Sequence, residues 1–143
     1  MKPQIEYRLL TPEDYDQALS LWRSCDGMRI GQGDDRVSYS RYILRNPGLS
    51  WAAFDGSLMV GTALCGHDGR RGLIYHLAVS AANRGQGIAK VMLKKGLDGL
   101  QECGIERAMI LVLKDNAVGQ EFWISQGFEP VDIAVTMGID LKQ

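Results

Sequence analysis

The residues best suited to chemistry form a short basic loop at residues 83–89, which reads NRGQGIA. A helix-like pattern follows this loop, and the first turn of a helix leaves backbone N–H groups unpaired at the positive end of the helix dipole. Glycines at positions 85 and 87 let an anion approach those N–H groups, and Arg84 adds a full positive charge. The loop is therefore a candidate pyrophosphate site, and a plain strand-to-helix turn is the alternative.

A second Gly-Gln-Gly triplet at residues 31–33 provides an internal comparison. Asp34 and Asp35 follow it directly, and two carboxylates would repel a phosphate group. We expect these two acids to attract a cationic amine substrate instead, with a solvated connecting loop as the alternative. The neighbouring charges, rather than the triplet itself, distinguish the two loops.

Two common nucleotide-binding motifs do not match the first loop. The Walker pattern GxxxxGK[ST] needs a Gly-Lys pair, which the chain lacks. The dinucleotide fingerprint GxGxxG needs a third glycine, but Lys90 stands at that position.

Periodicity along the chain predicts the elements that position these loops. Alternating residues predict six strands, in chain order at 4–10, 50–54, 58–65, 73–79, 106–113 and 132–141. Helical spacing predicts four helices. The first begins at Thr11-Pro12 and the second includes Tyr39 to Leu44. The third and fourth cover residues 87–103 and 116–126. This order indicates an α/β fold, a mixed sheet with helices on both faces. Gly96 and Gly99, inside the third helix, are expected to permit close packing on the sheet.

Composition narrows the class of protein. A chain of 143 residues, 45% of them apolar, suits a single domain over residues 1–143 with a sizeable core. A net charge of −1 argues against nucleic acid as a partner, and no apolar run reaches the roughly 20 residues of a membrane span. We therefore expect a cytoplasmic protein. The three cysteines show no CxxC pairing and are expected to be free, buried thiols.

Two segments together resemble the GNAT superfamily of N-acetyltransferases. Residues 84–89 (RGQGIA) match its R/Q-x-x-G-x-G/A signature, which here follows a strand reading YHLAV at 75–79. Downstream, Asn116, Phe122-Trp123 and Gly127-Phe128 resemble a second family segment, with Gly119 in place of its alanine. The resemblance covers nearly the whole chain. It implies a mostly antiparallel, twisted sheet of about six or seven strands.

The resemblance also implies a cosubstrate, acetyl-CoA, and no metal. Its implied binding residues are Leu77, Ala78, Val79, Arg84, Gly85, Gln86, Gly87, Ile88, Ala89, Asn116 and Trp123. The loop backbone would bind the pyrophosphate, and the end of the preceding strand would pair with the pantetheine arm. The backbone N–H of Val79 would polarise the thioester carbonyl. Asn116 is also a plain helix N-cap candidate, and the two roles are compatible.

The implied reaction is direct attack of an amine on the thioester, for which a base is useful. His76 is the candidate base, with a structural histidine as the alternative, whereas His67 is expected to be structural. Trp123 stands where many relatives carry a tyrosine that acts as the general acid, and an indole N–H is no practical acid. Tyr75 is expected on the face of the sheet opposite His76 unless a bulge intervenes.

Two other functions are alternatives to catalysis. One is a non-catalytic sensor that binds acetyl-CoA, which the missing tyrosine favours. The other is a structural domain with a vestigial site. The amine acceptor, whether a small molecule or a protein, is not specified by the sequence, and the chain is expected to be a monomer or a homodimer.

Overall fold

The computed structural model describes residues 4–141 and divides into two compact units. The larger unit ends at Leu111, and the smaller begins at Val112. The whole sheet belongs to the larger unit, whereas a single helix lies in the smaller one. The expectation of a single domain over 1–143 stays a prediction.

The larger unit contains a five-stranded sheet in the order β1-β2-β3-β4-β5. Its strands are β1 (Ile5–Leu9), β2 (Trp51–Asp55), β3 (Leu58–His67), β4 (Gly72–Val79) and β5 (Ala108–Ile110). The first four pair antiparallel, and β5 pairs parallel with β4. Short turns join the antiparallel pairs from β2 to β4, whereas the parallel pair needs a long crossover, which a helix supplies. The expected mixed, mostly antiparallel sheet is confirmed.

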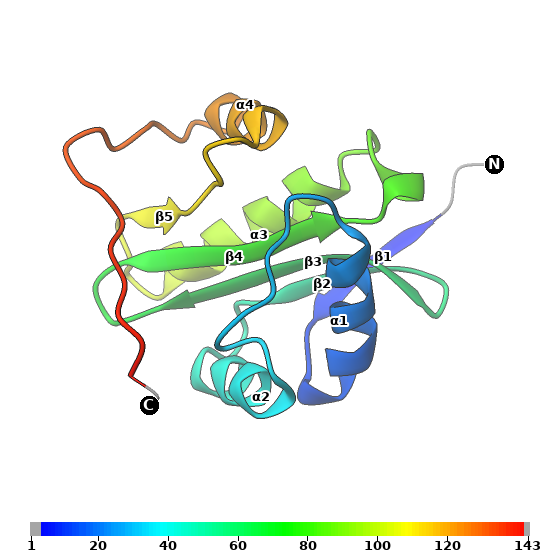
Figure 1. The fold of residues 1–143 in the computed structure, drawn as a ribbon. Helices are drawn as coiled ribbons and strands as arrows, with labels where there is room; N and C mark the ends of the chain where they lie inside the picture. The colour runs from blue at the N-terminus through cyan, green and yellow to red at the C-terminus, as the bar shows by residue number, and fades with distance from the viewer. Residues whose placement is uncertain (1–3, 142–143) are drawn as a thin grey trace. The chain divides into compact units, whose positions relative to one another are not determined.

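Helices cover both faces of this sheet, as the spacing predicts (Figure 1). On one face lie α1 (Tyr15–Ser24), which follows the 3₁₀ turn η1 (Pro12–Asp14), and α2 (Arg36–Arg45). On the other lies α3 (Ile88–Glu102), which follows the 3₁₀ turn η2 (Ala81–Asn83). The smaller unit holds α4 (Ala117–Ser125). Over residues 4–141, no helix is long and apolar enough to cross a membrane.

The face beneath α1 and α2 holds an aromatic core. Trp22 and Tyr39 are buried almost completely, with ring centroids 6.2 Å apart. They pack with Phe54, Leu64 and Ala78 of the sheet. Burying aromatic side chains supplies most of the apolar area in such a core, so this layer fixes where α1 and α2 sit over β4.

The opposite face packs closely on α3, as the two glycines in that helix lead us to expect. A Cβ atom at Gly96 would lie 2.4 Å from Sγ of Cys65 on β3. A Cβ atom at Gly99 would lie 2.8 Å from Cδ2 of Leu49. The expected close packing on the sheet is therefore confirmed at Gly96, whereas Gly99 approaches the segment that leads into β2.

Two expectations about strands and cysteines are wrong. Residues 132–141 form no strand, and the sheet has five strands rather than six or seven. An alternating sequence forms a strand only where a neighbouring edge pairs with its backbone, and the side chains of Ile133, Val135 and Met137 are 98%, 83% and 87% exposed. All three cysteines are free, but only Cys65 is buried, and Cys103 is exposed.

Replacing Gly96 with alanine should destabilise the protein. Overpacking costs about 1–3 kcal/mol, and a Cβ atom 2.4 Å from the wholly buried sulfur of Cys65 puts this site in the upper part of that range, about 2–3 kcal/mol. Helix propensity returns about 1 kcal/mol, so chemical denaturation should show a net loss of about 1–2 kcal/mol. Gly99→Ala is the matched control and should lose less stability, since its Cβ would approach only the far end of the Leu49 side chain, at 2.8 Å rather than 2.4 Å. A Gly96→Ala protein as stable as the wild type would contradict this packing.

Candidate active site

A β-bulge interrupts the pairing of β3 and β4 at the residues of interest. Thr62 pairs with Ala78 and Leu64 pairs with Tyr75, so two residues of β4 oppose one residue of β3. His76 lies in this bulge with φ of 46°, and it is the one non-glycine residue with positive φ among residues 4–141. Such a conformation stores strain of about 1–3 kcal/mol and is found preferentially at functional sites.

A buried chain of hydrogen bonds holds the bulge. Nε1 of Trp22 donates to Oγ1 of Thr62 over 2.9 Å, and that hydroxyl donates to the carbonyl oxygen of His76 over 2.8 Å. Thr62 is fully buried and Trp22 is 1% exposed. The imidazole of His76 also packs on the Trp22 indole, with ring centroids 4.5 Å apart. Sequence reasoning missed this role of Thr62 because nothing in its local pattern distinguishes it from other strand residues.

The connection between α1 and α2 brings Asp34 onto His76. Nε2 of His76 lies 2.8 Å from Oδ1 of Asp34. The other carboxylate oxygen accepts from the backbone N–H of Gly31 over 3.0 Å, and the hydroxyl of Tyr15 donates to the carbonyl of Asp34 over 2.6 Å. Two residues that the sequence marks for different reasons, 42 positions apart, are thus in direct contact.

Asp35 has different surroundings from its neighbour. It is the N-cap of α2, and its carboxylate accepts from the backbone N–H of Ser38 over 3.2 Å. Hydrogen bonds from the hydroxyl and backbone N–H of Ser38 lower the pKa of this exposed carboxyl. The structure therefore separates the two acids, one held against His76 and the other at a helix terminus.

Tyr75 does not lie on the face opposite His76, because the bulge breaks the strand alternation. Its ring lies 6.3 Å from that of Tyr42 on α2, on the same side of the sheet as α1. Tyr75 and His76 therefore both face the α1–α2 layer. Desolvation by burial raises the pKa of Tyr75, which makes its phenol a weaker acid.

Beyond the bulge, the end of β4 has an open edge. The backbone N–H of Ser80 donates to Val60 over 2.8 Å, next to the facing pair Gly61 and Val79. This is the pattern of a non-hydrogen-bonded antiparallel pair, so the N–H and C=O of Val79 point away from β3. On that side, β5 pairs with β4 only from Gly72 to Ile74, so within residues 4–111 it leaves Tyr75–Val79 unpaired.

The glycine-rich loop lies between β4 and α3, adjoining this edge in the chain. Gly85 and Gly87 have φ of 78° and 80°, the left-handed region that favours glycine. A Cβ atom at either position would meet nothing within 4 Å, so the space above the loop is open. No side chain caps the N-terminus of α3 at Gly87, which leaves its first N–H groups available. Nε of Arg84 donates to the carbonyl of Val79 over 3.3 Å, which connects the loop to the strand edge.

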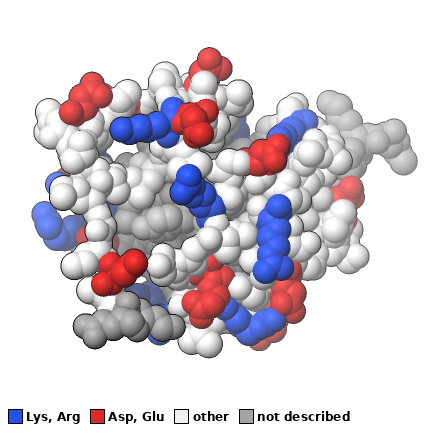
Figure 2. Space-filling model, viewed as in Figure 1, with Lys and Arg blue, Asp and Glu red and all other residues white. Residues whose placement is uncertain are grey.

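Two groups of the loop itself attract an anion, the Arg84 side chain and the N-terminus of α3. On the face drawn in Figure 2, Lys and Arg side chains are interspersed with Asp and Glu rather than gathered into one basic field.

Two further residues that the sequence marks lie in the smaller unit. Oδ1 of Asn116 accepts from the backbone N–H of Gly119 over 2.9 Å, so Asn116 is the N-cap of α4. A Cβ atom at Gly119 would lie 2.4 Å from Nδ2 of Asn116, so the Asn116 side chain packs closely over the first turn of α4. Trp123 packs against Phe122 and Phe128, with ring centroids 5.4 Å and 4.9 Å away.

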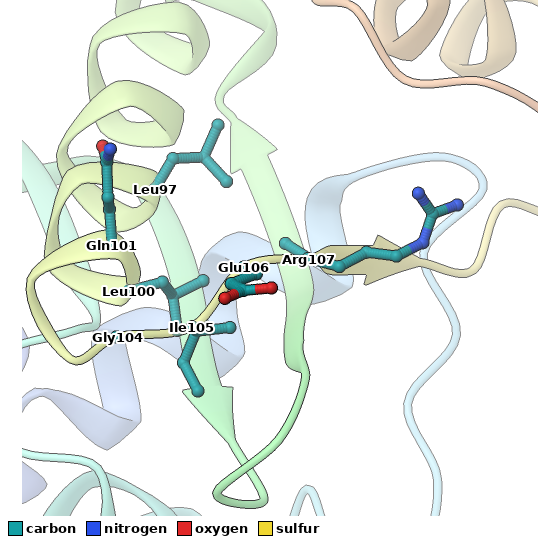
Figure 3. Close-up of a pocket in the computed structure, with 8 residues that line it drawn as sticks. Leu97, Leu100, Gln101, Gly104, Ile105, Glu106 and Arg107 are labelled. Carbon is teal, nitrogen blue, oxygen red and sulfur yellow. The ribbon is translucent and has the colours of Figure 1, made fainter.

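A separate surface hollow lies away from these residues. It has a volume of about 530 Å³ and adjoins the C-terminal end of α3, with Leu97, Leu100 and Ile105 among its lining residues (Figure 3). In this view the Arg107 side chain extends away from α3. A 15-residue helix is roughly 22 Å long, so the hollow and the glycine-rich loop lie at opposite ends of α3.

His67, also outside the site, accepts at Nδ1 from the backbone N–H of Gly69 in the β3–β4 turn over 2.9 Å.

Known proteins are similar to this chain in sequence and in fold. Residues 15–128 match the model of the acetyltransferase (GNAT) family. An acetyltransferase of Photorhabdus laumondii is 31% identical over 112 residues, which make up 78% of each chain.

Solved structures share the fold at lower sequence identity. The PaiA N-acetyltransferase of Thermoplasma acidophilum in complex with coenzyme A has a TM-score of 0.78 at 20% identity, over 90% of this chain and 92% of that one. A predicted acetyltransferase of Clostridium acetobutylicum with acetyl-CoA has a TM-score of 0.73 at 18% identity, over 94% and 96%. At these identities the two structures demonstrate the common fold.

Replacing Thr62 with valine should weaken both the core and the bulge. The isosteric change removes the hydroxyl and leaves buried Nε1 of Trp22 and the carbonyl of His76 without their partner, so the free energy of unfolding should fall by about 1–3 kcal/mol. Thr62→Ser is the control, because it keeps the hydroxyl and loses only a methyl group. Denaturant titration should rank the valine variant below the serine variant, and the reverse order would contradict the hydrogen-bond chain.

Proposed function

This chain belongs to the GNAT family of acetyltransferases, and from that premise we propose that it transfers an acetyl group from acetyl-CoA to a primary amine. One observation carries the proposal. The strained His76, the open edge at Val79 and the glycine-rich loop all lie within residues 76–89, around the end of β4. The edge at Val79 suits a thioester, the loop suits an anion, and His76 suits the transfer of a proton.

Binding of acetyl-CoA is proposed to use backbone groups first. The N–H groups at the start of α3, with Arg84 beside them, suit the pyrophosphate because they need no side chain to reach it. The unpaired backbone of Leu77 and Ala78 suits the amide groups of the pantetheine arm, and the outward N–H of Val79 suits the thioester carbonyl. The cofactor-binding role that the resemblance implies for Asn116 and Trp123 stays a prediction.

His76 is the proposed proton acceptor. The acceptor enters as an ammonium ion and must lose one proton before its nitrogen can attack, and an imidazole nitrogen takes that proton and passes it to solvent. The C–N bond then forms as the C–S bond breaks, and the N–H of Val79 stabilises charge on the thioester oxygen. The second proton lost from nitrogen goes to the departing thiolate, so the step needs no tyrosine at the position of Trp123.

A second candidate function is an acetyl-CoA sensor without turnover. It is favoured by one observation, the tryptophan at the position of the family's usual acid. The two candidates differ in a single measurement, which is release of free thiol from acetyl-CoA when amines are supplied.

Reversing the charge at Arg84 should weaken binding of acetyl-CoA. Losing one charge-assisted contact of about 1.5–3 kcal/mol corresponds to a rise in Kd of about 10- to 100-fold. Isothermal titration calorimetry of Arg84→Glu against the wild type measures this change. Arg70→Glu, in the turn at the other end of β4, is the control with the same charge change and should bind as the wild type does. Equal affinities of Arg84→Glu and Arg70→Glu for acetyl-CoA would show that the glycine-rich loop does not bind it.

Replacing His76 with asparagine should slow turnover strongly while binding of acetyl-CoA persists. Asparagine tolerates the left-handed backbone conformation and has no titratable nitrogen. We expect kcat to fall by about 10²- to 10⁴-fold, measured as thiol release with ethanolamine, glucosamine, a polyamine and a lysine peptide as acceptors. Full activity in His76→Asn would exclude this base. Acetyl-CoA binding by the wild type without thiol release for any of these amines would favour the sensor.

A further inference from the structure

We propose that Asp34 is a positioning residue, which fixes the tautomer and orientation of His76, and that it does not bind the acceptor amine. This inference rests on the proposed function, because it assigns His76 the proton-accepting role. It replaces the expectation that the carboxylate of Asp34 attracts the amine directly.

The carboxylate of Asp34 is already engaged by the protein. One oxygen lies 2.8 Å from Nε2 of His76, and the other accepts from the backbone N–H of Gly31. The side chains of Asp34 and His76 are only 16% and 14% exposed. An incoming ammonium group would have to displace both partners, whereas the carboxylate as it stands is placed to hold the imidazole.

The backbone around Asp34 is also held in place. Its N–H donates to Gly31 over 3.1 Å, and its carbonyl accepts from the hydroxyl of Tyr15 on α1. Carboxylate, backbone N–H and carbonyl therefore all have partners within the α1–α2 layer. A group held on three sides supplies the fixed geometry that orienting a catalytic imidazole needs.

This contact determines which nitrogen of His76 accepts a proton. An ionised carboxylate has only acceptor atoms, so Nε2 must carry the hydrogen that lies between the two groups. In the neutral ring, Nδ1 is then left with its lone pair, and Nδ1 takes the proton from the acceptor amine. The resulting imidazolium is charge-paired with Asp34 until the proton passes to solvent.

The described surroundings of His76 contain few other titratable groups. The ring packs on Trp22 of α1, and the carbonyl accepts from Thr62 of β3. Cys25, near the end of α1, donates to the carbonyl of Val79 over 3.8 Å rather than to the imidazole. Among the described contacts, the hydrogen bond to Asp34 therefore determines the tautomer of His76.

Nitrogen-15 NMR of the two histidine rings tests the assignment without any ligand. The chain has two histidines, so Asp34→Asn can be compared with the wild type under conditions where both rings are neutral. We expect the Nε2–H tautomer for His76 in the wild type and a shift toward the Nδ1–H tautomer in Asp34→Asn. Asp35→Asn, the same change one residue later, should leave the tautomer unaltered, and His67 serves as an internal reference. An Nδ1–H tautomer in the wild type would overturn the proposal.

A double-mutant cycle provides the kinetic test, with the panel amine that the wild type acetylates fastest. Asp34→Asn alone should lower kcat by about 10- to 100-fold with little change in the KM for the amine. In the His76→Asn background the same change should have no further effect, because a positioning residue acts only through the residue it positions. A higher KM for the amine in both backgrounds would instead show direct amine binding and overturn the proposal. Failure of the proposed function has a different signature, which is no thiol release by the wild type with any amine.

Discussion

The hydrogen-bond chain from the Trp22 indole through Thr62 to the carbonyl of His76 ties the core of this protein to its chemistry. An unpaired indole N–H or strand carbonyl would be destabilising at this depth, so core packing and the bulge stabilise each other. The bulge turns His76 toward the α1–α2 layer. The strain at its backbone is retained because Trp22, Thr62 and Asp34 each hold part of the residue from a different element.

The bulge also decides what the end of β4 can bind. The strand turns both backbone groups of Val79 away from β3 at the point where β5 no longer pairs with it. Arg84 donates back to that same residue from the glycine-rich loop. Within residues 4–111 the end of β4 therefore has an unpaired backbone edge next to the N-terminus of a helix, an arrangement suited to an extended, phosphate-bearing ligand.

Local patterns in the sequence account for the loop and most elements, because each depends on neighbours in the chain. The positive φ of Gly85 and Gly87, and the close approach of Gly96 to β3, follow from residue type and spacing. Contacts between residues far apart in the chain do not follow from local patterns. Strand alternation cannot place a bulge, so it predicted the wrong face for Tyr75, and no local signal joins Asp34 to a histidine 42 positions away. Residues 132–141 alternate as strands do, but the sequence does not specify a partner edge.

We propose that acetyl-CoA binds along the edge of β4 and over the start of α3. A titration of nitrogen-15-labelled protein with acetyl-CoA, followed through the backbone amide resonances, tests this placement. We expect the largest shifts on Val79 and residues 84–89, the groups proposed to bind the thioester and the pyrophosphate. Shifts concentrated at residues 101–108, around the hollow at the other end of α3, would contradict it.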